Sequence, residues 1–125
     1  MTRAVLLVDH GSRVAEANQA LEEVAEQLRA RLPDRMVFVS HLEIAPPSIG
    51  EGIDACVAAG ATEIAVHPYF LSPGRHTSRD IPREVEAAAA RHPGVRVRIT
   101  PALGPDPKLI DVIVARLGTG SNPRE

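Results

Sequence analysis

The chain has 125 residues, of which 44% are hydrophobic and 24% are charged, as expected for one globular domain that buries its own core. Aromatic residues make up 2% and the formal net charge is −2, so we expect no nucleic-acid partner and no attraction to anionic membranes. The single cysteine, Cys56, excludes a disulfide within the chain and argues against a cysteine-based zinc site.

The first predicted elements are a strand over residues 4–8 and a long helix. The strand is a continuous apolar run, which is typical of a strand buried on both faces. Because Asp9 and His10 end this run, it is too short for a signal peptide, and no stretch is long enough to span a bilayer. We therefore predict a cytoplasmic protein. Ser12 is the expected N-cap of the helix, which Pro33 ends. Its apolar stripe comprises Val14, Ala17, Leu21, Val24, Leu28 and Leu32.

The middle of the chain predicts a second strand over residues 36–42, a second helix and a third strand over residues 63–70. Pro46-Pro47-Ser48 opens the second helix, and Gly60 is a typical residue to end it. Its apolar stripe comprises Ile49, Ile53, Cys56 and Val57. Packing in the core is therefore the favoured role of Cys56. A loop over residues 71–79 is expected next.

The last part of the chain predicts two further helices and one more strand. Asp80 is the expected N-cap of the third helix, with Pro82 in its first turn. Residues 95–100 alternate apolar and polar side chains, which indicates a half-buried strand near a sheet edge. Asp106-Pro107 opens the last helix, and the polar residues 118–125 predict a frayed tail. The apolar positions of the last helix are Leu109, Ile110, Ile113 and Leu117.

Strict alternation of strands and helices predicts an α/β fold with a four-stranded parallel sheet and helices on both faces. We expect residues 1–117 to form this single domain. Ligands of such sheets bind outside the carboxyl ends of the strands. His10, Glu43 and the segment with His76 each follow a predicted strand, so they belong to that edge.

His10 and His76 have the chemistry of a metal site, provided that the first and third strands are neighbours. Imidazole binds cobalt, nickel and iron, and it accepts a proton near neutral pH. A structural role for each histidine is an equal alternative at this point. Glu43 is equally an ordinary carboxylate at a strand end or a group that carries metal or protons.

The remaining polar residues offer weaker indications. Arg75, Arg79 and Arg83 recur every four residues, as a solvated face or as a clamp for carboxylates, to which Arg13 could add. His41 and His67 are interpreted as sheet histidines, with His67 a candidate neighbour of the site. His92 is interpreted as a helix-end residue. Neither a GxGxxG nor a Walker motif occurs, so we expect no nucleotide cofactor.

Three segments together resemble the CbiX-type sirohydrochlorin cobaltochelatases and ferrochelatases, in their small single-module form. The segments are Val8-Asp9-His10-Gly11-Ser12-Arg13, then Leu42-Glu43-Ile44-Ala45-Pro46-Pro47-Ser48-Ile49, then residues 68–82 with Ser72-Pro73-Gly74-Arg75-His76-Thr77 at their centre. The resemblance extends over residues 4–117. No single tripeptide is specific, but the three segments in this order and spacing are.

This resemblance implies a chelatase-like three-layer domain that inserts a divalent metal into sirohydrochlorin, in cobalamin or siroheme biosynthesis. Cobalt is the favoured metal, and iron and nickel are the alternatives. The resemblance implies that His10 and His76 bind the metal and that His10 also accepts a proton. It implies a homodimer, since longer relatives hold two such modules in one chain. The tetrapyrrole is expected to contact Ala45, Ser72, Pro73, Gly74, Arg75, His76, Thr77 and Arg79.

Two other functions stay open at this point. The same surface could belong to a protein that carries metal or tetrapyrrole without catalysis. Histidine phosphatases also place a His-Gly pair after the first strand, but their phosphate-binding Arg precedes the His, where this chain has Asp9.

Overall fold

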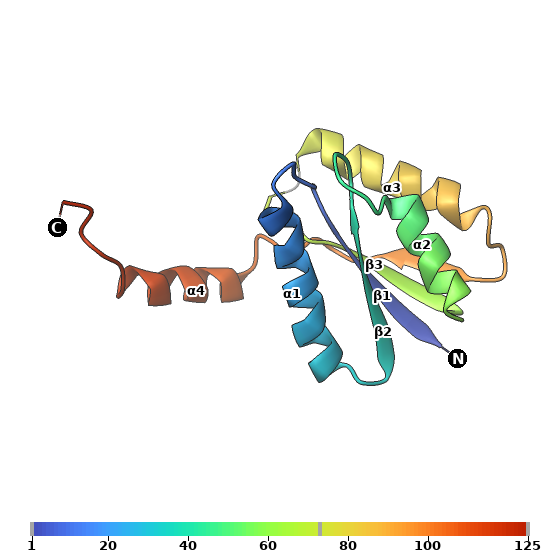
Figure 1. Ribbon diagram of the computed structural model, residues 1–125, viewed down its shortest axis with the longest axis horizontal. Coiled ribbons are helices and arrows are strands. Elements are labelled where there is room, and N and C mark those ends of the chain that lie inside the picture. The colour runs from blue at the N-terminus through green and yellow to red at the C-terminus, as the bar shows by residue number, and fades with distance from the viewer. Residues whose placement is uncertain (1, 73, 125) are drawn as a thin grey trace.

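The computed structural model describes residues 2–72 and 74–124, which alternate between strands and helices along the chain. The elements are β1 (Arg3–Asp9), α1 (Ala15–Arg31), β2 (Arg35–His41), α2 (Ile49–Ala58), β3 (Glu63–Pro68), α3 (Arg75–Ala89), β4 (Arg96–Ile99) and α4 (Pro107–Leu117). The four strands form one parallel sheet in the order β2-β1-β3-β4 (Figure 1). The predicted α/β fold is confirmed, including the contact between the first and third strands.

Strand β1 lies in the middle of the sheet, and this position explains its unbroken apolar run. Leu6 and Val8 point into the larger core, beneath α2 and α3. Val5 and Leu7 point into the smaller core, beneath α1. Because alternate side chains of a strand face opposite sides, a strand covered on both faces needs apolar residues at every position.

Helix α2 packs on the sheet as its apolar stripe predicts. Ile49, Ile53 and Cys56 are fully buried, and burial raises the pKa of the Cys56 thiol to about 12. Ser48 caps the helix in a reciprocal arrangement with Glu51: each side chain accepts a hydrogen bond from the other residue's backbone N–H. Gly60, with φ of +100°, follows the end of α2 in the conformation that favours glycine.

Helix α1 begins later than the sequence predicts, so the interpretation of Ser12 as its N-cap is wrong. The N-cap is Val14, and its side chain makes no capping hydrogen bond. Ser12 is held instead by Asn18, whose side chain bonds both backbone polar groups of Ser12. A helix residue therefore orders the connection after β1, and the Ser12 hydroxyl accepts from the Val14 N–H within that connection.

Helix α3 begins earlier than the sequence predicts, which turns much of the expected loop into its first turns. It runs from Arg75 with Gly74 as N-cap, so Asp80 is not its cap and Pro82 lies inside it. An interior proline removes one helical hydrogen bond but leaves the apolar face intact. That face, with Ile81 and Val85, is buried against the larger core. Burial of this face offsets the missing hydrogen bond.

Strand β4 lies at a sheet edge, as predicted, and α4 leaves the body of the domain beyond it (Figure 1). Asp106 caps α4 through the Lys108 N–H, in agreement with the sequence. The helix nevertheless contributes no buried residue. Residues 118–124 of the predicted tail are exposed. Within the described residues, no helix has the length and apolar content needed to cross a membrane.

Candidate functional site

His10 and Glu43 meet where β1 and β2 end. The backbone ladder continues past the strands, because the Leu42 N–H donates to the Asp9 carbonyl and the Glu43 N–H donates to the His10 carbonyl. These bonds bring His10 Nε2 to 3.3 Å from Glu43 Oε1. Both side chains are about half exposed, at 54% and 52%. The pair is therefore open to a ligand that arrives from solvent.

Gly11 allows the two connections to come this close. Its φ is +94°, and a Cβ at this position would lie 1.9 Å from the Glu43 carbonyl oxygen. Ile44, next to Glu43, also has a positive φ, of 74°, which is unusual for a β-branched residue. Ala45 closes this turn by donating its N–H to the Glu43 carbonyl at 2.8 Å. Backbone strain is thus concentrated beside the carboxylate of Glu43.

A second carboxylate–histidine pair lies directly below this surface. Asp9 Oδ1 contacts His41 Nδ1, and the His41 side chain is 4% exposed. The interpretation of His41 as a sheet histidine with a hydrogen-bond partner is confirmed. Sequence reasoning did not assign Asp9 as that partner, although the parallel register places Asp9 opposite His41. The pair fixes the ends of β1 and β2 beneath His10.

His76 lies in the first turn of α3, where Asp80 is its partner. His76 Nε2 is 2.7 Å from Asp80 Oδ2, and the histidine side chain is 75% exposed. Asp80 also lies 3.7 Å from Arg83 Nη1. Residues four apart face the same side of a helix, so the early start of α3 creates this pair. The sequence pattern could have revealed it had the helix been placed correctly.

Three observations place these groups at one edge of the sheet. The start of α3 lies at the same end of the molecule as the connection after β1 (Figure 1). Phe70, which follows β3, packs edge-on against His10 with ring centroids 5.8 Å apart. On α3, burial raises the pKa of Glu84, with further contributions from the negative charges of Asp80 and Glu43. The helix carrying His76 therefore faces the turn carrying Glu43.

Glu84 is a member of this edge that sequence reasoning missed. It follows His76 and Asp80 at a spacing of four residues, so all three lie along one side of α3. Its Oε2 atom is buried and has no hydrogen-bond partner among the described residues. The spacing alone could have identified it, once α3 was known to begin at Arg75.

The expected tetrapyrrole contacts divide into exposed and buried residues. Ser72, Gly74, Arg75 and Arg79 are exposed, Ala45 is half-buried, and Thr77 is buried at 5% exposure. Pro73 lies outside the described residues. Arg13, like Arg75 and Arg79, is exposed and forms no ion pair within the part of the chain that the structure describes. These three guanidinium groups are thus available to carboxylates.

The side chains at this edge that have the chemistry of metal ligands come in pairs. Over residues 2–72 and 74–124, no group of three or more His, Cys, Asp or Glu side chains is arranged to hold a metal ion. The structure offers two imidazoles instead, each with its Nε2 beside one carboxylate oxygen. Sites with few protein ligands leave coordination positions open, as a metal that must be passed on requires.

The other two histidines, His67 and His92, have partners outside this edge of the sheet. His67 Nδ1 is 2.8 Å from Thr100 Oγ1, and burial lowers the pKa of His67. His92 Nε2 is 2.7 Å from Asp54 Oδ1, where α3 has ended. The hydrogen bond from His92, followed by that from Arg91, lowers the pKa of Asp54. His92 is therefore part of a contact between α2 and the end of α3.

Fold and site together define an α/β domain of the chelatase type, with a histidine pair at the carboxyl edge of a parallel sheet. The chain belongs to the CbiX family, whose model matches residues 4–119. The family resemblance of the three sequence segments is thereby confirmed.

Proteins similar to this chain in sequence and in structure include sirohydrochlorin chelatases. The chain is 40% identical over 113 residues to the chloroplastic sirohydrochlorin ferrochelatase of Arabidopsis thaliana, with 90% of this chain and 50% of that protein covered. It superposes with a TM-score of 0.86 and 34% identity on the sirohydrochlorin chelatase SirB from Bacillus subtilis subspecies spizizenii in complex with cobalt, covering 98% of this chain and 56% of the other. The chain thus spans about half the length of the curated relatives it matches first.

A relative of similar length also exists among solved structures. The putative cobalamin biosynthesis CbiX protein from Marinobacter aquaeolei VT8 superposes with a TM-score of 0.77 and 28% identity. The match covers 93% of this chain and 98% of that one.

Proposed function

We propose that this chain is a sirohydrochlorin chelatase that inserts a divalent metal into the macrocycle, in cobalamin or siroheme biosynthesis. Cobalt is the metal we favour, and iron and nickel are the alternatives. One observation carries the proposal: His10 and His76 stand at the same edge of the sheet, each beside a carboxylate oxygen. Family membership and the names of the relatives support it.

The proposed roles of His10, His76 and Glu43 follow from the chemistry of their side chains. His10 and His76 bind the incoming metal as neutral imidazoles, a form in which a ring nitrogen lone pair is free. Insertion releases two pyrrole protons: His10 accepts one as the metal leaves it for the macrocycle, and the other passes to the solvent to which this half-exposed site is open. Glu43, 3.3 Å from His10, is placed to take that proton onward or to stabilise the imidazolium.

The substrate surface continues from this pair along the connection before α3 and its first turns. Sirohydrochlorin carries eight carboxylates, and Arg75 and Arg79 are exposed and without carboxylate partners among the described residues. Guanidinium groups bind carboxylates through two parallel hydrogen bonds. We propose that Ala45 and the segment from Ser72 to Thr77, which includes Pro73 and Gly74, contact the ring itself.

The proposal includes a homodimer, because a single module corresponds to half of the two-module relatives. A cytoplasmic location and the lack of a nucleotide cofactor stay predictions from the sequence. Residues 1–117 as one chelatase domain, followed by a frayed tail, likewise stay a proposal.

An anaerobic insertion assay tests the function. The protein is incubated with sirohydrochlorin and Co²⁺, Fe²⁺ or Ni²⁺ in turn, and the change in the pigment's absorption spectrum is followed. We expect faster insertion than without protein for at least one metal. We expect His10→Ala and His76→Ala each to lower the rate by roughly 100-fold, within the range found for acid–base groups. His92→Ala is the matched control, since His92 lies in the contact with Asp54, and it should keep the wild-type rate.

Two results would contradict the proposal. Wild-type protein that gives no acceleration with any of the three metals would exclude a chelatase. Tight binding of sirohydrochlorin without turnover would instead identify a tetrapyrrole carrier.

A further inference from the structure

The amino ends of the strands carry a cluster of charged side chains that the proposed chelatase does not use. Arg3 begins β1, and the backbone register places it beside Arg35 of β2 on one side and Glu63 of β3 on the other. Arg98 comes from β4, the strand beyond β3. The common direction of the strands therefore gathers three arginines and one glutamate at the end of the sheet away from the metal-handling edge.

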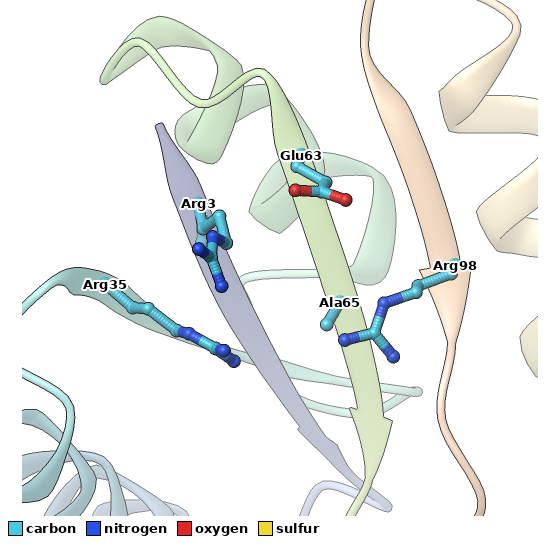
Figure 2. A pocket seen from close by; sticks show the side chains of 6 residues that line it. Arg3, Arg35, Glu63, Ala65 and Arg98 are labelled. Atoms are coloured by element: carbon cyan, nitrogen blue, oxygen red, sulfur yellow. The ribbon is translucent and has the colours of Figure 1, made fainter. Parts of the chain in front are cut away.

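These side chains share one face of the sheet and surround a hollow. Residues in register on neighbouring parallel strands point to the same side, as do residues two apart along one strand. Figure 2 shows the side chains of Arg35 and Arg98 reaching toward one another across β1 and β3, with Arg3 between them. The hollow has a volume of about 80 Å³. Because Ala65 lines it with a single methyl group, the space between the guanidinium groups stays open.

The positive charge of this hollow is not neutralised within the described part of the chain. None of its three guanidinium groups forms an ion pair there. Three cations and the single carboxylate of Glu63 leave a net charge of +2 at the hollow. Arg96, in register with Glu63 on the same face, adds a further positive charge beside it. Neighbouring strands are about 4.8 Å apart, so Arg3 and Arg35 repel each other in this register.

One hydrogen-bond donor at the hollow is buried without an acceptor. Arg35 Nε has no hydrogen-bond partner among the described residues. A buried donor without a partner costs free energy, and folded proteins nearly always supply one from protein, water or a bound ion. The N–H groups of a guanidinium lie in one plane and match two oxygens of the same anion. An oxyanion in the hollow would therefore supply both an acceptor for Arg35 and the missing negative charge.

The volume and charge of the hollow define the kind of anion that fits it. A space of about 80 Å³ holds a few water molecules, which is the size of a phosphate or sulfate ion. It is far too small for a tetrapyrrole macrocycle. Two negative charges on the ligand would balance the net charge of the three arginines and Glu63. Size and charge together thus indicate a small oxyanion with two negative charges.

We propose that Arg3, Arg35 and Arg98 form a binding site for a small tetrahedral oxyanion, either a free phosphate or sulfate ion or the phosphate group of a small molecule. The three guanidinium groups donate hydrogen bonds to its oxygens, and Glu63 limits the affinity by repelling it. His10 follows the other end of β1, about 23 Å of strand away from Arg3. The site is therefore separate from the metal and the macrocycle, and it goes beyond the proposed function.

Isothermal titration calorimetry at constant ionic strength tests the site. Sodium phosphate, sodium sulfate and phenyl phosphate are titrated separately into the protein in a chloride buffer, and we expect saturable binding of one anion per chain. Binding of phenyl phosphate would identify a phosphate group on a larger molecule as a ligand, and binding of the inorganic ions alone would identify the free ion. Arg35→Gln and Arg98→Gln should each weaken binding by roughly tenfold or more. Arg31→Gln is the matched control, since Arg31 ends α1 at the same end of the molecule without lining the hollow, and it should weaken binding by less than about twofold.

Glu63→Gln gives the decisive measurement, because it should strengthen binding. The substitution removes a negative charge from the hollow and keeps the size of the side chain, so we expect affinity to rise by about twofold to fivefold. A misfolded variant could not produce this gain. Glu26→Gln, at an exposed position of α1, changes the net charge equally and should leave the affinity unchanged. Wild type without saturable binding, a Glu63→Gln variant that binds no more tightly, or equal weakening by Arg31→Gln and Arg35→Gln would each overturn the proposal.

Discussion

At the scale of single residues, the site depends on how closely two backbone segments approach. His10 and Glu43 come together because Gly11 leaves room for the Glu43 carbonyl oxygen. No side chain fits there, and the φ of +94° disfavours any residue with a Cβ. Residue 11 must therefore be glycine because the Glu43 carbonyl oxygen occupies the space of a side chain.

Gly11→Ala should destabilise the protein and displace Glu43 from His10. The new Cβ would lie 1.9 Å from the Glu43 carbonyl oxygen, so the connection after β2 must move. We expect a loss of about 2–3 kcal/mol in the free energy of unfolding, at the upper end of ordinary single substitutions. Chemical denaturation measures this loss, and the insertion rate should fall with it.

Gly60→Ala is the matched control for that substitution. Gly60 also has a positive φ, of +100°, but a Cβ added there would meet no atom within 4 Å. It therefore isolates the cost of the backbone conformation, about 1 kcal/mol. Equal losses in the free energy of unfolding at the two positions would contradict this, because they would show that the Glu43 carbonyl moves aside at no cost.

At the scale of elements, helix α2 shows how a small residue sets the distance between a helix and the sheet. A Cβ on Gly52 would lie 2.0 Å from Ser40 Oγ and 2.8 Å from Leu6 Cδ1. Ser40 is fully buried and donates its hydroxyl to the Ser48 carbonyl at 2.8 Å. The absence of a side chain at residue 52 lets α2 pack directly on β1 and β2.

Gly52→Ala and Gly50→Ala should change stability in opposite directions within one helix. Alanine at position 52 must push α2 away from Ser40 and Leu6, which costs about 1–3 kcal/mol. At position 50 the nearest atom, Arg91 Nη2, lies at an ordinary 3.5 Å, so the better helix propensity of alanine should stabilise by about 0.5–1 kcal/mol. Thermal unfolding of both variants checks the signs, and a stabilised Gly52→Ala would contradict this packing.

The start of α3 shows where sequence patterns lead to a wrong boundary. Asp80 followed by Pro82 is a typical helix opening, and it predicted a helix whose N-cap lies six residues too late, at Asp80 instead of Gly74. The true N-cap, Gly74, makes no side-chain capping bond, so no local signal marks it. Burial of Thr77 and Ile81 extends the helix backward, and this extension pairs His76 with Asp80. The His76–Asp80 pair therefore depends on the packing of α3 and not on a local sequence pattern.

At the scale of the whole molecule, the dependence of stability on pH includes a contribution from His67. Burial lowers the pKa of His67 in the folded state below its ordinary value of 6.5. Its Nδ1 donates to Thr100 Oγ1, since that hydroxyl itself donates to the Pro101 carbonyl. The folded protein therefore favours the neutral histidine.

His67→Gln should make unfolding less sensitive to pH between about 7 and 5. As the pH falls below 6.5, the unfolded chain takes up a proton at His67 while the folded chain resists it, so wild type loses stability. The loss cannot exceed about 1.4 kcal/mol per pH unit for one proton. Glutamine keeps a hydrogen-bond donor for Thr100 but does not titrate. Denaturation at several pH values measures both slopes, and parallel curves would show that His67 titrates normally.

The sequence by itself determined the parallel sheet, the burial of β1 on both faces and the edge at which His10, Glu43 and His76 gather. These features follow from periodicity and from the common direction of parallel strands, which local residue types encode. Only the tertiary structure decided that Gly11 leaves room for the Glu43 carbonyl, that His76 pairs with Asp80, and that α4 contributes no buried residue to the domain. Those outcomes depend on contacts between distant segments, and an apolar stripe shows that a helix needs a partner without showing which surface supplies it.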